Sequence, residues 1–284
     1  MSVGKFDHVL LASDFDNTLV HTKAAIDAGS PDIPPMPERN RKALDYFTRN
    51  GGYFAVSTGR AVPAFARYAG DLPINAPCII ANGAGLYDFR AEQYIATAFI
   101  DEGIRPRVAA LLERFPQLPF EIYHTDRRIH AMHPNQFILN HEHLTRTKIE
   151  VVDSFDAVDF PLVKLLFEDE RDKLDAVCDF IRAQDWSAEY ELIHSSDNLL
   201  EMTARGATKG GMVLRLAELL GVKRENLYCI GDHGNDVSMA EVSAIRFAPA
   251  NAIPDMLSLP EMHVVSHCAD GAVADVIEAL DRIY

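Results

Sequence analysis

Four short apolar segments, each followed at once by polar or glycine residues, constrain the fold of this chain most strongly. They lie at residues 9–12, 54–57, 78–81 and 227–231. Stretches with helical spacing of apolar residues lie between them, at residues 38–50, 61–69 and 209–220. Short buried strands that alternate with helices are typical of a parallel sheet with helices on both faces. We therefore predict an α/β fold built on a doubly wound parallel sheet.

The pattern changes between residues 86 and 204, where helices and strands follow each other in a different order. The expected helices span residues 104–115 and 169–184, and the expected strands span residues 120–124, 129–132, 162–167 and 198–203. After this region the parallel-sheet pattern resumes, with further strands at 245–247 and 263–265 and a closing helix at 270–284. We predict an α+β lobe at residues 86–204, inserted into a sheet domain made of residues 1–85 and 205–284.

Composition excludes several classes of protein. The chain has 284 residues, of which 48% are hydrophobic and 24% charged, as is typical of a water-soluble globular protein. Its net charge of −15 argues against nucleic acid or an anionic membrane as a partner, since both require a basic face. No apolar stretch approaches the roughly 18–20 residues of a membrane span. The first nine residues lack the pattern of a signal peptide, so we expect a cytoplasmic protein.

The four cysteines are widely scattered and show no C-x-x-C spacing. Three of them lie in apolar surroundings that suggest burial. Neither a disulfide framework nor a structural zinc site is expected.

Polar clusters follow each of the four strands of the sheet domain. They are Asp14 with Asp16, the run Ser57-Thr58-Gly59-Arg60, the pair Asn82-Gly83, and the run from Gly231 to Asp236. In open α/β sheets, ligands bind beyond the carboxyl ends of the strands, so these clusters should converge on one crevice. Lys209 at the start of a helix adds a cation. Carboxylates, a lysine and a hydroxyl are the groups of a magnesium-assisted phosphoryl-transfer site.

Taken singly, each cluster has an ordinary structural explanation. Two aspartates at a strand end can be solvated acids or a helix N-cap, and Lys209 alone can be an exposed lysine in a first helical turn. Ser57 competes with Thr58 as the hydroxyl that faces the crevice, because a one-residue slip reverses the side of a strand that a residue faces. Only the ordered set favours catalysis.

In order, these residues resemble the four motifs of the haloacid dehalogenase superfamily. The matching runs are Asp14-x-Asp16-x-Thr18, Thr58-Gly59-Arg60, Lys209 and Gly231-Asp232-x-x-Asn235-Asp236. Asn82-Gly83-Ala84 and Asn251-Ala252 resemble its Cof-type branch, in which a large cap is inserted between the second and third motifs. The resemblance implies a Rossmann-like core with a cap, and a Mg²⁺-dependent phosphatase of sugar phosphates or related small metabolites.

The resemblance also implies a role for each matching residue. Asp14 is the nucleophile that forms an aspartyl-phosphate, Asp16 the general acid and base, and Thr58 and Lys209 stabilise the phosphoryl group. Further substrate contacts are expected from Gly59, Arg60, Asn82, Asn235 and Asn251. Mg²⁺ is expected to bind Asp14, the backbone carbonyl of Asp16, Asp232 and Asp236, of which Asp236 orients Lys209 or a metal-bound water. Two departures from the pattern, Asn17 and His233, touch no expected catalytic group, although His233 has a possible role near the substrate.

The inserted lobe should select the substrate, because a lid excludes water and contacts the leaving group. Arg127, Arg128 and His130 stand in a stretch rich in basic groups, and we predict that they contact a polar leaving group. The alternative is a hairpin whose turn is charged because it is solvated. His141 and His143 are paired, but without a third ligand nearby we expect surface solvation and not zinc.

The resulting prediction is a phosphoric monoester hydrolase acting on a small-molecule phosphate ester. A phosphomutase of the same superfamily, which returns the phosphoryl group to the substrate, remains an alternative. A second alternative is a sensor that binds a sugar phosphate and has lost catalytic turnover. A receiver-type signalling domain is disfavoured by the length of the chain, the inserted lobe and the second aspartate at the first strand.

Overall fold

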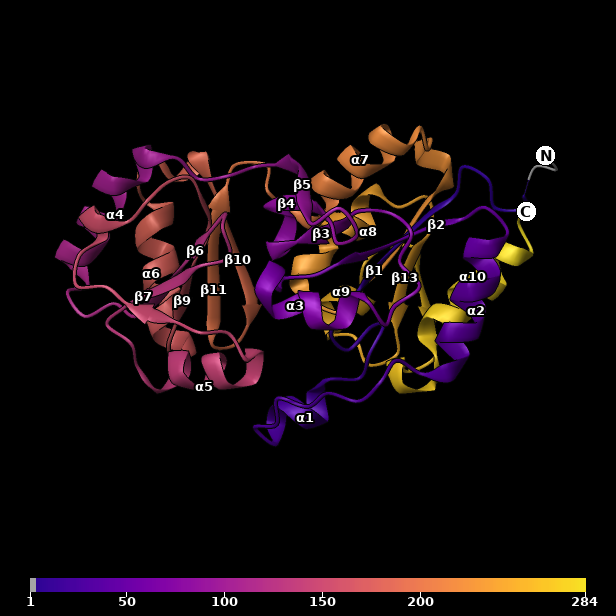
Figure 1. Ribbon diagram of the computed structural model, residues 1–284, viewed down its shortest axis with the longest axis horizontal. Coiled ribbons are helices and arrows are strands. Elements are labelled where there is room, and N and C mark those ends of the chain that lie inside the picture. Colours follow the sequence, from indigo (N-terminus) through magenta and orange to yellow (C-terminus); the bar gives the residue numbers. More distant parts are fainter. Residues whose placement is uncertain (1–3) are drawn as a thin grey trace.

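An eight-stranded sheet forms the centre of the larger lobe (Figure 1) in this computed structural model, which describes residues 4–284. Its strand order is β14-β13-β12-β1-β2-β3-β4-β5. The strands are β1 (Leu10–Asp14), β2 (Tyr53–Ser57), β3 (Cys78–Ile80), β4 (Gly85–Asp88), β5 (Gln93–Thr97), β12 (Leu227–Ile230), β13 (Arg246–Pro249) and β14 (Met262–Val265). Those from β14 to β3 run parallel, whereas β4 and β5 form an antiparallel edge.

Helices cover both faces of this sheet because successive residues of each strand point to opposite sides. Leu11 and Phe54 pack with α2 (Glu38–Arg49), α3 (Val62–Ala69) and α10 (Ala272–Asp281). Leu10 and Ala55 pack on the other side with α7 (Lys209–Leu220) and α8 (Val237–Val242). Two short helices, α1 (Lys23–Asp27) and α9 (Pro254–Leu257), complete the lobe. The predicted doubly wound α/β fold is confirmed.

The second lobe is a six-stranded sheet with helices on it (Figure 1). Its strand order is β10-β11-β9-β6-β7-β8. The strands are β6 (Phe120–His124), β7 (Ile129–Met132), β8 (Glu150–Val151), β9 (Leu162–Glu168), β10 (Tyr190–Ser196) and β11 (Leu199–Ala204). Apolar residues of α4 (Arg105–Arg114) and α6 (Arg171–Arg182) form the core on one face, and α5 (Gln136–Thr145) is a further helix that the sequence did not predict.

The inserted lobe begins later than the predicted residue 86. Both β4 and β5 belong to the eight-stranded sheet, where Ile79 of β3 is the register partner of Leu86. Leu86 is fully buried there, in the cluster beneath α7. A local apolar pattern indicates a strand but not the sheet that the strand joins, so the boundary was misplaced by this hairpin.

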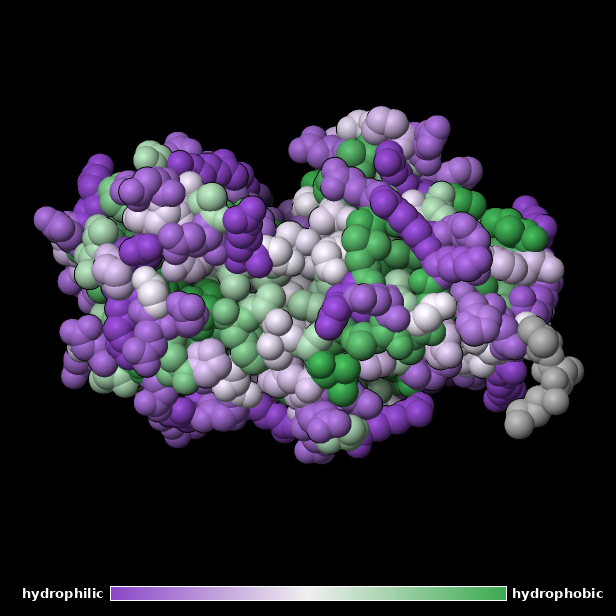
Figure 2. Space-filling view, turned by 90° about the horizontal axis from the view of Figure 1, so that it is seen from above, coloured by the Kyte–Doolittle hydropathy of each residue, from purple (hydrophilic) through white to green (hydrophobic). Residues whose placement is uncertain are grey.

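The face of the second sheet opposite α4 and α6 packs on the strand ends of the first. Tyr123, Val163 and Leu166 form one buried cluster with Ala61, Ala81 and Ala84 of the sheet domain. These small alanines let the two backbones approach closely. Figure 2 shows the region between the lobes as paler and more hydrophobic than the hydrophilic outer surface of the inserted lobe. The lobe is therefore seated over the edge where the polar clusters lie.

All four cysteines are buried and free, whereas apolar surroundings had suggested burial for three of them. Within residues 4–284, no helix is both long and apolar enough to cross a membrane.

A glycine brings the third strand end against the start of α7. Gly83 has a φ of +101°, and a Cβ there would lie 2.2 Å from the carbonyl oxygen of Thr208. Thr208 caps α7, since its hydroxyl accepts a hydrogen bond from the Gly211 amide. Gly83 thus allows the 3-10 turn η1 (Ala81–Gly83) to contact the helix that carries Lys209.

We expect Gly83→Ala to destabilise the protein more than a glycine substitution that meets no neighbour. Gly29 also has a positive φ, of +65°, but a Cβ there has nothing within 4 Å. Both variants carry the strain of a left-handed alanine, so the difference isolates the clash, which should cost roughly 1–3 kcal/mol. Urea unfolding of both variants measures it. Equal stabilities would show that α7 does not depend on this contact.

Candidate active site

The register of the parallel strands aligns the predicted site residues at one edge of the sheet. Asp14 is the register partner of Ser57 on β2, and Ser13 is the partner of Ile230 on β12. Three adjacent strands therefore end at nearly the same level, with Asp14 at the end of β1, Thr58 directly after β2 and Asp232 shortly after β12. This edge is the one that the inserted lobe covers.

Lys209 joins two of the aspartates through its ammonium group. Its Nζ donates to Asp14 Oδ1 at 2.6 Å and to Asp236 Oδ1 at 2.7 Å. The lysine is 1% exposed and Asp14 is 5% exposed. A buried ammonium group requires such partners, because its desolvation is otherwise uncompensated. The contacts fix Lys209 beside the predicted nucleophile.

Asp236 holds the loop after β12 as well as the lysine. Its Oδ2 accepts hydrogen bonds from the backbone amides of Asp232 at 3.0 Å and His233 at 3.1 Å. The loop turns tightly here, since a Cβ on Gly231 would lie 2.4 Å from the Asp236 Cβ. Both Asp236 oxygens are engaged by these donors, and the contacts favour the orienting role over direct metal ligation.

Asp232 points into the same cluster. It accepts a hydrogen bond from the Thr18 hydroxyl at 3.0 Å, and its carboxylate lies with those of Asp14 and Asp236 within 4.8 Å. Burial raises the pKa of Asp232 to about 7, and the charge of Asp236 adds to this effect. Burial likewise raises the pKa of Asp14 well above its ordinary value, although Lys209 opposes the shift.

One lysine faces three buried carboxylates in this cluster, so negative charge is in excess. Hard oxygen ligands close together are the donor set that Mg²⁺ prefers. Asp14 and Asp232, which retain free carboxylate oxygens, fit a divalent cation that would relieve the excess negative charge. The observed residues are therefore compatible with the expected metal.

Asp16 is held by Arg60 in a paired contact. Arg60 Nε donates to Asp16 Oδ2 at 2.8 Å, and Nη2 donates to Oδ1 at 2.7 Å. Burial acts to raise the pKa of Asp16, but the Arg60 guanidinium outweighs burial and the pKa is lowered. Arg60 was predicted to contact substrate. That role stays a prediction, and in this arrangement Arg60 positions the predicted acid and base.

The hydroxyl and amide groups expected around a phosphate lie close to one another. Thr58 Oγ1 accepts a hydrogen bond from the Arg60 amide at 3.1 Å, which leaves its own O–H free to donate. Asn235 Nδ2 donates to Asn82 Oδ1 at 2.9 Å, and within residues 4–284 Asn82 Nδ2 has no acceptor. A Cβ at position 59 would lie 3.0 Å from that nitrogen, so glycine at this position leaves room for the Asn82 side chain.

The remaining sheet-domain residues lie beside this group. Asn251 Nδ2 donates to the carbonyl oxygen of Asn17 at 2.8 Å, which tethers the segment after Asp16. Ser57 Oγ is buried and has no partner among the described residues. The choice between Ser57 and Thr58 as phosphate donor stays a prediction.

The three residues predicted in the inserted lobe have other partners. Arg127 donates to the Tyr87 hydroxyl at 2.5 Å, Arg128 pairs with Asp126 and Asp159, and His130 lies 3.0 Å from a ring nitrogen of His124. Both arginine side chains are exposed. These contacts favour the solvated hairpin, and a role in leaving-group binding stays a prediction.

A buried ion pair that the sequence reasoning missed lies at the junction of the lobes. Lys164 Nζ donates to Glu201 Oε2 at 2.9 Å and to the Gly59 carbonyl oxygen at 3.1 Å. Lys164 is 3% exposed and Glu201 is 2% exposed. A lysine inside the apolar strand 162–167 was the available signal. Its partner on β11 could not be inferred, because the order of strands in the sheet was unknown.

His141 is not solvated as expected. Its Nδ1 lies 2.9 Å from Glu121 Oε1 and 3.2 Å from Glu168 Oε1, and both glutamates are almost fully buried. The Tyr123 hydroxyl also donates to Glu121, at 2.5 Å. Burial acts to lower the pKa of His141, but the two carboxylates outweigh it and raise the pKa to about 10. An imidazolium thus ties α5 to β6 and β9.

A family model described as haloacid dehalogenase-like hydrolase matches residues 11–277. The Bacillus subtilis protein YxeH is 27% identical over 279 residues, covering 95% of this chain and 97% of YxeH. The Bacillus subtilis 5-amino-6-(5-phospho-D-ribitylamino)uracil phosphatase YwtE is 25% identical over 271 residues, covering 87% of this chain and 89% of YwtE.

Among solved structures, a sugar phosphatase of haloacid dehalogenase subclass IIB superposes with a TM-score of 0.79. The match has 20% sequence identity and covers 96% of this chain and 99% of the other. It supports the fold of both lobes together.

The His141 cluster predicts a pH dependence of stability. Because the pKa of His141 is raised from 6.5 to about 10 on folding, its stabilisation is complete below about pH 6.5 and is lost as the pH rises toward 10. Burial raises the pKa of Glu168 to about 7, so Glu168 titrates in the same range. We therefore expect the double variant His141→Gln with Glu168→Gln to remove this loss, so that its unfolding free energy changes less than that of the wild type between pH 6.5 and 10. His143→Gln, at an exposed position of the same helix, should behave as the wild type. Parallel pH profiles for all three proteins would contradict the assignment.

Proposed function

Because the chain belongs to the haloacid dehalogenase-like hydrolases, we propose that it is a Mg²⁺-dependent phosphatase of a small sugar phosphate. The observation that carries this proposal is the buried set of Asp14, Lys209, Asp232 and Asp236 at one sheet edge. The enzyme is a phosphoric monoester hydrolase, and its substrate is a small phosphate ester.

Asp14 is the nucleophile. Its carboxylate stands at the end of β1, where Lys209 contacts one oxygen and leaves the other free. Attack on phosphorus forms an aspartyl-phosphate and releases the alcohol, and water then hydrolyses this intermediate. Lys209, the Thr58 hydroxyl and Asn82 Nδ2 are the donors that stabilise the developing charge on the phosphoryl oxygens.

Asp14, the backbone carbonyl of Asp16 and Asp232 would hold Mg²⁺. When bound, the ion neutralises phosphoryl oxygens and orients them for in-line attack. Asp236 keeps the ligand Asp232 in place through its backbone amide and keeps Lys209 beside the nucleophile. Asp236 therefore acts through its neighbours and is a positioning residue.

Asp16 moves the protons. As an acid it gives a proton to the leaving oxygen, and as a base it takes one from the attacking water. Its pairing with Arg60 favours the carboxylate, which is the form needed for the second step. Arg60 also restricts the direction in which Asp16 can point. The pair thus sets both the charge and the orientation of the proton carrier.

The proposed leaving group is polyhydroxylated. Lys164 and Glu201 lie on the lobe face that covers the site, and Lys164 contacts the carbonyl of Gly59 between Thr58 and Arg60. A buried pair of opposite charge offers both donors and acceptors, which suits hydroxyl groups. The relative YwtE is named for a ribityl phosphate, and the solved relative of subclass IIB is named a sugar phosphatase. Both names support this substrate class.

We expect Asp14→Asn to reduce phosphate release from a panel of sugar phosphates by at least about 10³-fold, because the amide is a poor nucleophile. The measurement is inorganic phosphate with Mg²⁺ present, with chelator added in a parallel sample. Asp27→Asn, at an exposed position, serves as the matched control. Full activity of Asp14→Asn would remove the nucleophile assignment. Isomerised sugar phosphate without free phosphate in the wild type would indicate a mutase.

We expect Glu201→Gln to lower kcat/KM for sugar phosphates by about tenfold or more, and to leave 4-nitrophenyl phosphate nearly unaffected. The reason is that the variant alters a contact to hydroxyl groups that the aryl ester lacks. Alanine at Arg127, Arg128 and His130 tests the other predicted contacts in the same panel. If Glu201→Gln affects both esters equally while an Arg127, Arg128 or His130 variant is selective, the leaving group binds at the hairpin instead.

A further inference from the structure

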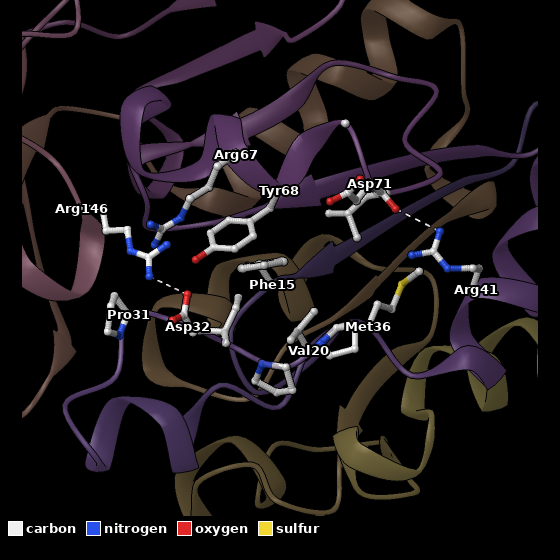
Figure 3. Close-up of a pocket in the computed structure, with 15 residues that line it drawn as sticks. Phe15, Val20, Pro31, Asp32, Met36, Arg41, Arg67, Tyr68, Asp71 and Arg146 are labelled. Atoms are coloured by element: carbon white, nitrogen blue, oxygen red, sulfur yellow. Dashed lines mark hydrogen bonds and ion pairs between the residues drawn. The ribbon is translucent and has the colours of Figure 1, made fainter.

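A cavity of about 660 Å³ lies between α3 and residues 31–36, a segment that contains three prolines (Figure 3). Phe15, Val20 and Met36 give it an apolar floor. Arg67 and Tyr68 contribute from α3, and Arg146 contributes from the turn after α5. Its volume lies within the range of roughly 300–1,000 Å³ that is usual for small-molecule sites.

Arg67 lines this cavity and carries two donors that are not used. Its Nη2 donates to the Leu144 carbonyl oxygen at 3.2 Å, and its guanidinium lies 4.7 Å from the centroid of the Tyr68 ring. Within residues 4–284, the buried Nε and Nη1 atoms of Arg67 have no acceptor. Buried N–H groups are normally paired, so these two call for an acceptor from outside the described residues.

Tyr68 adds a third unused group at the same end of the cavity. Its hydroxyl is buried and has no partner among the described residues. Figure 3 shows this hydroxyl pointing toward the guanidinium groups of Arg67 and Arg146. Arg146 reaches in from the inserted lobe and pairs with Asp32 at 2.5 Å across the mouth. The three groups converge on one small volume.

The charge around the cavity is opposite to that of the protein. Three arginines line it, against the two carboxylates of Asp32 and Asp71, in a chain of net charge −15. One of the arginines, Arg41, is held at the far end by the Asp71 carbonyl oxygen at 3.0 Å. The lining therefore selects an anion, and its apolar floor selects an apolar body.

We propose that this cavity binds a small organic anion, composed of an oxyanion group on an apolar body, as a site separate from the phosphatase centre. Arg67, Arg146 and the Tyr68 hydroxyl bind the oxyanion. The apolar body lies on Phe15, Val20 and Met36. A carboxylate and a phosphonate share this chemistry.

The position of the cavity couples it to both lobes and to Asp16. Arg146 belongs to the inserted lobe and Arg67 to the sheet domain, so one ligand would contact both and hold them together. The Phe15 and Tyr68 rings lie 5.5 and 5.4 Å from the Arg60 guanidinium carbon, and Arg60 holds Asp16. An occupant should therefore slow turnover by retaining this arrangement of the lobes. This kinetic consequence rests on the proposed function, whereas binding does not.

The probe is anilinonaphthalene sulfonate, which combines an oxyanion with an apolar body and fluoresces when bound. We expect the wild type to bind it, and Arg67→Met to bind at least about tenfold more weakly, because the charge is lost and the apolar stem is kept. Tyr68→Phe, which retains the ring, should weaken binding about threefold. Arg205→Gln, an exposed arginine elsewhere, should bind as the wild type does. Displacement of the dye by phenylacetate or by phenylphosphonate identifies the preferred oxyanion.

Binding that is absent in the wild type, or equal in the wild type and in both folded cavity variants, would overturn the proposal. Circular dichroism verifies folding. In the kinetic arm, saturating dye should lower kcat for the wild type and leave it unchanged for Arg67→Met. If the dye leaves the wild-type kcat unchanged but binds the cavity variants more weakly, the coupling between the cavity and turnover is wrong and the binding site is supported. Asp14→Asn should still bind the dye, because Asp14 does not line the cavity. The binding test therefore stands even if Asp14→Asn shows that the phosphatase assignment is wrong.

Discussion

The ammonium group of Lys209, buried between Asp14 and Asp236, is the interaction on which the rest of the structure depends. It joins the end of β1, the first residue of α7 and the turn after β12 through contacts of 2.6 and 2.7 Å. Removing one partner from such a buried pair costs roughly 3–5 kcal/mol, because the other charge is left uncompensated. The fold must therefore bring three distant segments together. Gly83 and Gly231 serve this need, since a side chain at either would collide with the neighbouring segment.

Buried charges in the inserted lobe are likewise paired with opposite charges. Lys164 with Glu201, and His141 with two glutamates, are buried pairs on the sheet strands and the helix α5. Most of their charge is compensated within the lobe. The lobe rests on the sheet domain through alanines and apolar side chains. The Lys164 contact to Gly59 then adds a polar link at the position where substrate specificity is proposed.

Sequence patterns predicted the elements whose apolar residues repeat regularly between clear turn signals. The strands at 120–124 and 129–132 and the helix at 209–220 have the predicted bounds. Helix α5 was missed because its position depends on the contacts of His141 and not on a strong apolar stripe. The hairpin of β4 and β5 was placed in the wrong lobe, since pairing with β3 is a long-range property. The Asp16–Arg60 contact spans 44 residues, and no local pattern encodes it.

That contact also poses the central chemical question of the site. In the proposed mechanism Asp16 has to be protonated when the alcohol leaves and ionised when water attacks, yet the Arg60 guanidinium lowers its pKa in this structure. The incoming phosphoryl group carries negative charge, which raises the pKa of a nearby carboxyl group and attracts the guanidinium. Arrival of substrate would therefore favour a protonated Asp16, and departure of the alcohol would restore the pairing. In this way Arg60 would govern both proton transfers, and the rings of Phe15 and Tyr68 lie beside its guanidinium group.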